Sequence, residues 1–351
     1  MILIDGHLDL AMNALLLNRD LTLSVFEIRK QEIGMPEKGK GTGTVAFPEM
    51  HKGKVGVCMA TILPRMVKDG VWSGYSSPAM SCAAGRGQLA YYQILEKQGF
   101  IRIIKTSETL NAHIQEWQES QQEHVPLGFV LSMEGADAIL DPENLVSWWK
   151  DGLRVVSLVH YGVNTYAHGT GASGGLTLEG LKLLETLESL GAVLDVTHLS
   201  DESFWEALDN FDGSILASHN NCRDLVPGDR QFSDEQIRAL TRREAVIGVA
   251  FDAWMLYPGW IKGKTPNTVV TMEAVADQLD HIRRLAENSR NVGIGSDLDG
   301  GFGKEQCPHD LDTIADLQKI PKILKSRTYS DNDVENVMWR NWVRLFRRAW
   351  S

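Results

Sequence analysis

Residues 2–9 read Ile-Leu-Ile-Asp-Gly-His-Leu-Asp, and this opening stretch carries the first evidence for both the fold and the site. Its apolar beginning is typical of a buried strand, and it ends in a histidine and an aspartate two residues apart. On an extended backbone such residues point to the same side, so His7 and Asp9 would present an imidazole and a carboxylate together. That pair suits a divalent metal such as zinc. Taken alone, it fits a core strand that runs into a turn better than it fits a metal site.

The pattern then repeats, because seven more short apolar runs alternate with helical patterns. Continuous apolar strands are typical of a parallel sheet covered on both faces. Eight strand–helix units predict a (β/α)8 TIM barrel, with a doubly wound open sheet as the competing fold. A short strand-like piece lies at 101–104. The later strands are expected at 54–63, 126–133, 153–159, 191–197, 214–218, 245–251 and 291–296. The main helices are expected at 78–98, 142–150, 177–190, 200–208, 271–286 and 331–350.

Length and composition fit one large domain. The chain has 351 residues, of which 43% are hydrophobic and 23% charged, and a barrel of this type typically takes ~250 residues or more. We therefore expect a single TIM-barrel domain over 1–351 with a C-terminal helical tail. The net charge of -11, without any basic block, argues against binding of nucleic acid or of an anionic membrane.

Cysteine usage and hydropathy bear on the compartment. The four cysteines are scattered, which argues against a disulfide framework and against a zinc ribbon. No signal peptide is visible, and no apolar run reaches the about 20 residues that span a bilayer. The expectation is a cytoplasmic protein without a membrane anchor. The cysteines are Cys58, Cys82, Cys222 and Cys307.

Histidines and acidic residues stand at the ends of the predicted strands. In a barrel the carboxyl ends of all strands open on one face, where such enzymes carry their active sites. Any one of these histidines alone fits a structural role better than a ligand role, but a whole series in register is hard to reach by chance. The series is His7, Asp9, Glu134, His160, His198, His219 and Asp297.

Seven motifs carry a resemblance that runs in order over nearly the whole chain, as far as 342–346. They are His7-x-Asp9, Ser132-Met-Glu134-Gly135, the run 157–164, Asp195-Val-Thr-His198-Leu-Ser200, Ser218-His219-Asn220, Asp229-Arg230 and Gly295-Ser-Asp297-Leu-Asp-Gly300. Together they resemble the membrane (renal) dipeptidase family, peptidase family M19 of the amidohydrolase superfamily. The resemblance implies a barrel peptidase with two Zn²⁺ ions, which hydrolyses dipeptides through a hydroxide that bridges the metals.

The resemblance also implies a ligand set. His7 and Asp9 would hold one zinc, His198 and His219 would hold the other, and Glu134 would bridge both. The chemistry agrees with that arrangement, because zinc lowers the pKa of bound water towards about 7 and two such ions can share a carboxylate.

The remaining roles concern the substrate. By resemblance, Asp297 would contact the bridging water, His160 the substrate carbonyl or the tetrahedral intermediate, and Arg230 the terminal carboxylate. An arginine offers a planar fork that matches a carboxylate, which would select short peptides with a free C-terminus. Asp299 is the alternative acid after the eighth strand, and Arg223 is the alternative carboxylate binder; we favour Asp297 and Arg230.

Other features have a supporting or open role. Asp195 is expected to support a histidine from behind. The glycine-rich stretch 38–44 is expected to be an exposed loop, and His168, in the second glycine-rich region, a lid residue or an exposed one. The segment 251–260 departs from the family, which often has a tyrosine-containing segment there. Its Trp254, Met255, Tyr257 and Trp260 are expected either to line the pocket or to pack, and the tail tryptophans Trp339, Trp342 and Trp350 either to pack on the barrel or to form a homodimer contact.

The leading hypothesis is a zinc-dependent dipeptidase whose substrates include, as one option, those with a C-terminal D-residue. A first alternative is another binuclear hydrolase of the superfamily, acting on a lactone, a cyclic amide or an N-acyl amino acid. Many such relatives bridge their metals with a modified lysine on the fourth strand, whereas this strand ends in His160 and holds no lysine. A second alternative is a non-catalytic binding protein on the same barrel, although no expected ligand is missing.

Overall fold

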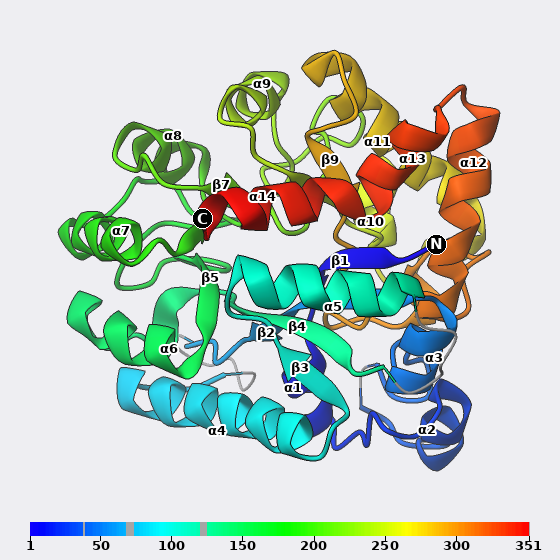
Figure 1. Cartoon of the computed structure of the whole chain (residues 1–351), viewed down its shortest axis with the longest axis horizontal. Coiled ribbons are helices and arrows are strands. Elements are labelled where there is room, and N and C mark those ends of the chain that lie inside the picture. The colour runs from blue at the N-terminus through cyan, green and yellow to red at the C-terminus, as the bar shows by residue number, and fades with distance from the viewer. Residues whose placement is uncertain (38, 68–73, 120–124, 351) are drawn as a thin grey trace.

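The computed structural model describes residues 1–37, 39–67, 74–119 and 125–350, and it is a parallel β-barrel ringed by helices (Figure 1). The strands follow the order β7-β6-β5-β4-β2-β1-β9-β8, and Ala217, directly after β7, pairs with Ile247 of β8 to close the circle. The prediction of a (β/α)8 barrel is confirmed. The strands are β1 (Leu3–Leu8), β2 (Val55–Ile62), β3 (Ile101–Ile103), β4 (Leu127–Met133), β5 (Leu153–Ser157), β6 (Val193–Asp195), β7 (Ile215–Leu216), β8 (Ile247–Val249) and β9 (Val292–Ile294).

β3 is an additional short strand that lies off the path of the barrel. It pairs with the first half of β4, from Ile101↔Leu127 to Ile103↔Phe129. β5 pairs with β4 from Leu131 onward. The strand-like piece at 101–104 is therefore a strand, but the barrel itself keeps the predicted eight.

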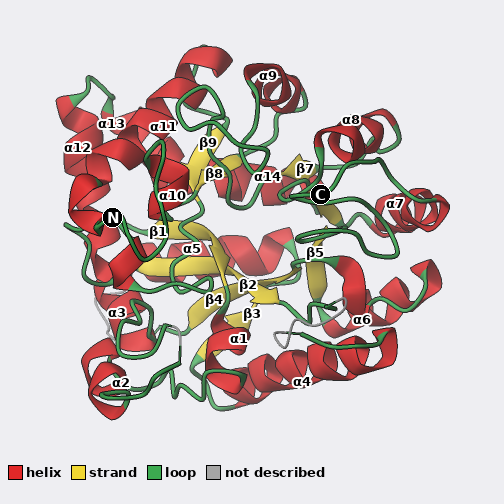
Figure 2. Ribbon diagram, turned by 180° about the vertical axis from the view of Figure 1, so that it is seen from behind, coloured by secondary structure: helices red, strands yellow, loops and turns green. Residues whose placement is uncertain are grey.

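Helices cover the outside of the barrel between successive strands (Figure 2). Several begin at a cap that the sequence encodes: Ser24 before α2 and Ser233 before α9 each form a reciprocal capping box with the residue three positions later. The helices are α1 (Leu10–Leu15), α2 (Val25–Gln31), α3 (Phe47–Lys52), α4 (Pro78–Lys97), α5 (Ser107–Glu119), α6 (Leu145–Asp151), α7 (Leu178–Leu190), α8 (Asp201–Asp209), α9 (Asp234–Arg242), α10 (Ala253–Leu256), α11 (Met272–Ala286), α12 (Ile320–Ser326), α13 (Asp331–Glu335) and α14 (Asn341–Ala349).

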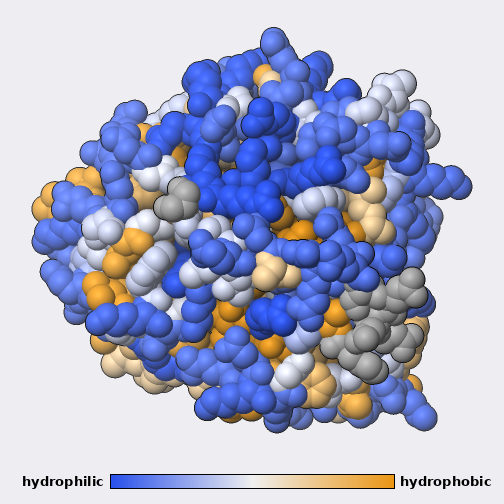
Figure 3. All heavy atoms as spheres, viewed as in Figure 1, coloured by the Kyte–Doolittle hydropathy of each residue, from blue (hydrophilic) through white to orange (hydrophobic). Residues whose placement is uncertain are grey.

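The helix expected at 331–350 contains a π-helical turn, Asn336–Arg340, between α13 and α14. Directly after this turn, Asn341 donates from Nδ2 to the carbonyls of Ser289 and Val292, at 2.6 and 2.7 Å. These bonds fasten the start of α14 to the segment that leads into β9 and to β9 itself. α14 then crosses the end of the barrel that faces the viewer in Figure 1, and its outer side is strongly hydrophilic (Figure 3).

The inner side of α14 fills that end of the barrel with the indole of Trp342, which is fully buried. A Cβ atom at Gly6 would lie 2.7 Å from Trp342 Cζ2, and one at Gly293 would lie 2.7 Å from its Nε1. The indole Nε1 donates to the carbonyl of Ile294 at 3.2 Å. Of the two alternatives for the tail tryptophans, Trp342 thus packs on the barrel, and only glycine leaves room for it on β1 and β9.

β1 carries a bulge just before its polar end. Asp5 pairs with Cys58 and Leu8 pairs with Ala60, so β1 takes three steps where β2 takes two. Asp5 fixes this irregular turn, because its Oδ1 accepts hydrogen bonds from the backbone N–H of His7 at 3.2 Å and of Ser296 at 2.8 Å. Bulges of this kind re-aim side chains next to functional sites.

The glycine-rich stretch 38–44 is not the exposed loop that the sequence predicts; Lys38 itself lies outside the described residues. The backbone N–H of Gly41 donates to Glu32 at 2.7 Å, and the backbone N–H and hydroxyl of Thr44 donate to Asp299, each at 2.8 Å. Thr44 and both acids are buried. The stretch packs inward because buried carboxylates need donors, and its backbone supplies them.

Candidate metal centre and active site

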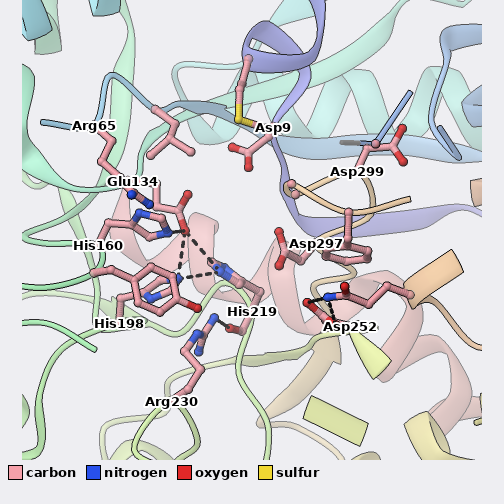
Figure 4. Close-up of a pocket in the computed structure, with 18 of the residues that line it drawn as sticks. Asp9, Arg65, Glu134, His160, His198, His219, Arg230, Asp252, Asp297 and Asp299 are labelled. Atoms are coloured by element: carbon pink, nitrogen blue, oxygen red, sulfur yellow. Dashed lines mark hydrogen bonds and ion pairs between the residues drawn. The ribbon is translucent and has the colours of Figure 1, made fainter. Parts of the chain in front are cut away.

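The strand ends bring seven predicted residues to one mouth of the barrel. His7 lies on β1 and Asp9 just beyond it, and Glu134 directly follows β4. The loops after the next strands add the others (Figure 4). His198 and Asp297 have φ angles of 71° and 57°, a left-handed conformation that is uncommon for residues with side chains and that clusters at functional sites. The residues from the later loops are His160 after β5, His198 after β6, His219 after β7 and Asp297 after β9.

Glu134 stands at the centre of this cluster, and its two oxygens face different partners. Oε1 lies 3.1 Å from His198 Nε2 and 3.3 Å from His219 Nε2. Oε2 lies 3.7 Å from His7 Nε2. The two histidine Nε2 atoms are 3.2 Å apart. The carboxylate therefore separates one pair of imidazoles from a third, as a bridging ligand would.

The His7 side of the cluster is rich in acid. His7 Nε2 lies 3.7 Å from Asp9 Oδ1 and 3.9 Å from Asp297 Oδ1. Within the described residues, three overlapping groups place their ligand atoms within 4.8 Å of one another: His7 with Glu134 and His219, His7 with Asp9 and Asp297, and Glu134 with His160 and His198.

These side chains fit divalent metal. His7 Nε2 and Asp9 Oδ1 are buried and have no hydrogen-bond partner among the described residues, which is costly for polar atoms unless a cation takes their lone pairs. Ser218 Oγ lies 2.8 Å from His219 Nδ1, and Thr170 Oγ1 lies 3.1 Å from His198 Nδ1. With a proton on each Nδ1, both Nε2 lone pairs point at Glu134, which is how ligating histidines are oriented from behind.

The electrostatics of the mouth point the same way. Burial raises the pKa of Glu134 to about 8, although His7 partly offsets it, and burial also raises the pKa of Asp297. Burial alone would lower the pKa of His7, but Glu134, Asp9 and Asp297 outweigh it and raise that pKa to about 10. Burial lowers the pKa of His198 well below its usual value. Three carboxylates held this closely create a site that favours a cation.

The mouth opens into a cavity of about 960 Å³. His160 lies where the cluster meets this cavity, with its Nε2 3.7 Å from Glu134 Oε1. Its Nδ1 is buried and has no hydrogen-bond partner among the described residues. Burial lowers the pKa of His160, with Arg65 and Arg230 adding to the effect, so the imidazole is neutral. Arg65 and Tyr161 also line the cavity, and the sequence did not single them out as site residues. Asp252 lines it too, in the segment 251–260 that departs from the family.

Arg230 and Arg223 have clearly different surroundings. Arg230 is buried in the cavity wall and donates from Nη1 to Asn220 Oδ1 at 3.0 Å and from Nη2 to the His219 carbonyl at 2.9 Å. Arg223 instead forms a two-bond ion pair with Asp201 at 2.8 and 2.7 Å, partly exposed to solvent. Only Arg230 of the two lines the cavity.

The acids near β9 and β6 also separate. Asp297 faces the metal cluster, whereas Asp299 is occupied by Thr44 and by Val45, whose backbone N–H donates to it at 3.0 Å. Asp195 was expected to support a histidine, but among the described residues its side chain forms no hydrogen bond with a histidine side chain. Its Oδ1 accepts from the backbone N–H of Thr197 and of Ser218, both at 3.0 Å, so it fixes the backbone next to His198 and His219.

The second glycine-rich region lies against the site. A Cβ atom at Gly169 would come within 2.2 Å of the His160 carbonyl, and one at Gly174 within 2.9 Å of the His168 ring. His168 is therefore packed in the loop, where its Nδ1 lies 2.7 Å from the Gly175 carbonyl. Thr170 in this region contacts His198 Nδ1 through its hydroxyl, and no residue spacing in the sequence predicts this contact.

The segment after β8 contributes unequally to the cavity. Trp254, Met255 and Trp260 line it, whereas Tyr257 is exposed and does not. Asp252 lines it too, and both of its oxygens accept from Gln306 Nε2, at 2.8 and 2.9 Å. Burial raises the pKa of Asp252 to about 6, with Gln306 opposing it. Among the described residues no helix combines the length and apolarity needed to cross a membrane.

Comparison with known proteins places this site in a family. A sequence profile of the membrane dipeptidases (peptidase family M19) matches residues 1–350. A dipeptidase, tcpJ, of Claviceps purpurea is 26% identical over 206 residues, which cover 56% of this chain and 45% of that protein, so the match spans about half the length of this curated relative.

Two solved structures share the fold. A metallopeptidase of family M19 described as dipeptidase AC superposes with a TM-score of 0.81 at 20% identity, covering 100% of this chain and 99% of its own. A metallopeptidase of Rhodobacter sphaeroides, bound to a phosphinate mimic of the dipeptide L-Ala-D-Ala, gives 0.80 at 20% identity with the same coverage. The profile match over the whole length shows that this chain belongs to the membrane dipeptidase family of metallopeptidases, as the order of its motifs predicted.

Proposed function

We propose that this chain is a dipeptidase that uses two divalent metal ions, zinc in the first instance, and hydrolyses short peptides with a free C-terminal carboxylate. The observation that carries the proposal is the central position of Glu134, whose two oxygens face His7 on one side and His198 with His219 on the other. Membership of a metallopeptidase family supports it.

In this proposal His7 and Asp9 hold one ion, His198 and His219 hold the other, and Glu134 contacts both. When bound, such ions polarise the scissile carbonyl and make water a nucleophile at neutral pH. The three carboxylates of the mouth offset most of the added positive charge. The hydroxyl of Ser218 keeps the His219 ring in its orientation.

Asp297 is the proposed proton carrier. Its carboxylate lies at the cluster, with Oδ1 3.9 Å from His7 Nε2, and a carboxylate at this place can accept and release a proton. It would take the proton that the attacking water loses and deliver it to the departing amine nitrogen. An amide needs that delivery because the unprotonated amine is a poor leaving group.

His160 and Arg230 are the proposed substrate ligands. The neutral imidazole of His160 would donate a hydrogen bond to the substrate carbonyl oxygen as negative charge develops there. Arg230 is held by Asn220 and by the His219 carbonyl, and its remaining N–H groups would bind the C-terminal carboxylate. The dipeptide mimic bound to the Rhodobacter sphaeroides protein supports testing D-residues at the C-terminal position.

Metal analysis together with a dipeptide panel tests this function. The panel should include matched peptides with L- and D-alanine at the C-terminus, and the C-terminal amide of each. We expect two metal ions per chain and turnover of the free acids only. Two bound metals without turnover of any dipeptide would remove the peptidase proposal while leaving the metal site.

Arg230→Ala separates this function from lactone or cyclic-amide hydrolysis. Losing a charge-assisted pair with the terminal carboxylate should lower kcat/KM for dipeptides by roughly 10- to 100-fold, chiefly through KM. Arg223→Ala is the matched control, because it removes an arginine of the same loop that points to Asp201 instead. Equal losses in the two variants would contradict the assignment of Arg230.

A further inference from the structure

Arg65 places a positive charge in the wall of the cavity. It follows β2 and precedes Met66, which bridges to Tyr75, and it lines the cavity together with Glu134 and His160. Among the described residues no ion pair and no side-chain hydrogen bond of its guanidinium is found, although its charge acts on the buried carboxylate of Asp137 and opposes the rise of that pKa. Figure 4 shows Arg65 beside His160 and Arg230 on the far side of His198.

The other charged groups of the cavity are already engaged or lie at its rim. Arg230 donates two hydrogen bonds inside the protein. Asp299 accepts hydrogen bonds from Thr44 and Val45 and lies 3.6 Å from Arg19. Lys262 is exposed. Of the two arginines that line the cavity, Arg65 is therefore the one whose guanidinium donates no hydrogen bond to another described residue.

The charge balance of the cavity is positive once the residues of the metal cluster are set aside. Among the described residues that line it, Arg65, Arg230 and Lys262 stand against Asp252, since Asp299 is matched by Arg19; Asp137, which the charge of Arg65 also reaches, is buried and does not line the cavity. A dipeptide with neutral side chains brings one carboxylate, which the proposed function assigns to Arg230. Such a substrate has no second carboxylate that could pair with Arg65.

We propose that Arg65 binds a second carboxylate on the substrate, so that the preferred substrates are dipeptides with an aspartate or glutamate side chain. This inference rests on the proposed function and names its substrate class. A guanidinium presents a planar fork that matches a carboxylate with two hydrogen bonds, and a partly buried site protects that pair from screening by salt.

Arg65 could also affect catalysis through His160, and the test must distinguish this effect from the binding of a second carboxylate. It contributes to keeping His160 neutral, and through His160 it would affect every substrate alike. A side-chain carboxylate, in contrast, distinguishes an acidic dipeptide from its amide. The informative quantity is therefore the ratio of kcat/KM between Ala-Glu and Ala-Gln, and between Asp-Ala and Asn-Ala.

We expect the wild-type enzyme to prefer the acidic member of at least one pair by roughly 10- to 100-fold, and this ratio to fall as salt is added. Arg65→Gln should bring the ratio close to 1, whatever its effect on the absolute rates through His160, and Arg65→Lys should restore part of the ratio. Arg102→Gln is the matched control. It removes an arginine that also lies beside a histidine, 3.0 Å from His113, but at the opposite end of the barrel, and it should leave the ratio as in wild type.

Two outcomes would overturn the inference: a wild-type ratio near 1 in both pairs, or equal loss on all four substrates in Arg65→Gln. Calorimetric binding of N-acetylglutamate against N-acetylglutamine reports on the same contact without turnover. If no dipeptide is hydrolysed but wild type binds the diacid more tightly and Arg65→Gln does not, the peptidase proposal fails and the second carboxylate site stands. If the two ligands bind wild type equally, the site itself is refuted.

Discussion

Hydroxyl groups hold two of the site histidines from behind, and each belongs to a residue that ligand spacing does not reveal. Ser218 Oγ lies 2.8 Å from His219 Nδ1, and Thr170 Oγ1 lies 3.1 Å from His198 Nδ1. Such contacts fix the tautomer and the ring orientation of a ligating histidine. Thr170 comes from a glycine-rich loop after β5, so it belongs to a different barrel unit from His198.

Thr170→Val keeps the shape of the side chain and removes this contact. Because the His198 ring loses its fixed orientation, we expect metal affinity to fall by roughly 10- to 100-fold. Competition with a chelator of known affinity measures this directly, whether or not the enzyme is active. Thr186→Val on α7 is the control, since its hydroxyl bonds only the Lys182 carbonyl of its own helix among the described residues. Unchanged metal affinity in Thr170→Val would show that the hydroxyl is dispensable.

At this scale the sequence predicts which histidines and acids gather at the mouth of the barrel, but it does not predict the residues that contact them from behind. The seven strand-end residues could be found because strand ends in a barrel share one mouth, and Arg230 because a motif marked it. Arg65, Tyr161 and Thr170 lie on loops whose course depends on packing, so no periodicity positions them. Asp195 was expected to support a histidine, but backbone N–H groups two and twenty-three residues away occupy its Oδ1.

Among the elements, β4 and α5 meet through a buried histidine at the end of the barrel away from the site. His113 of α5 has Nε2 2.8 Å from the Gly56 carbonyl and Nδ1 3.0 Å from Arg102 Nη1. A guanidinium can only donate, so Nδ1 accepts and Nε2 carries the proton. Gly128 of β4 leaves room for the ring, because a Cβ atom there would lie 2.6 Å from His113 Nε2.

This contact predicts a pH dependence of stability. Burial lowers the pKa of His113 from 6.5 to about 4, with Gly56 opposing and Arg102 adding to the shift. Between these pH values the folded state binds fewer protons than the unfolded chain, so the free energy of unfolding falls as pH falls from 6.5 to 4. The difference between a pKa of 6.5 in the unfolded chain and about 4 in the folded protein sets a ceiling of about 3 kcal/mol on this loss.

Urea unfolding of wild type and His113→Gln across that range checks the prediction. Glutamine cannot take the extra proton, so the variant should be less stable at pH 7 and should show a shallower decline towards pH 4. His309→Gln is the control, because it removes an exposed histidine elsewhere and should keep the wild-type slope. Parallel curves for wild type and His113→Gln would contradict this account.

Element boundaries followed from the sequence where local signals were strong. Continuous apolar runs placed the barrel strands, and capping residues and helical patterns placed α4, α6, α7, α8 and α11 close to their ends, whereas α1, α2, α3, α9, α10 and α12 were not predicted. The π-helical turn before α14 and the bulge in β1 were not predicted, because each depends on contacts with distant segments: Asn341 with Val292, and Asp5 with Ser296. The stretch 38–44 was misjudged for the same reason, since its partner Asp299 lies far along the chain.

For the whole molecule, the tail joins the first and last strands. We propose that 1–351 folds as one unit, because Trp342 packs against glycines of both β1 and β9 inside the barrel. Trp342→Ala should lower the free energy of unfolding by about 3–5 kcal/mol, the usual cost of emptying a large buried aromatic site.

Denaturant unfolding followed by circular dichroism measures that loss. Trp339→Ala is the matched control, because Trp339 is only partly buried and packs at the edge of the same cluster, and its loss should cost clearly less. Similar small losses in both variants, or two separate transitions in wild type, would contradict a single unit that depends on Trp342.

The position of Trp342 near the end of the sequence has a consequence for biosynthesis. All the strands of the barrel precede Trp342 in the sequence, so each leaves the ribosome before the residue that fills the space between β1 and β9. Until Trp342 has been translated, we expect the apolar residues at this end of the barrel to stay exposed in the nascent chain, where chaperones and proteases can bind them. We therefore expect the mouth at the opposite rim to be completed only after Trp342 has been translated, which is later than every proposed metal ligand.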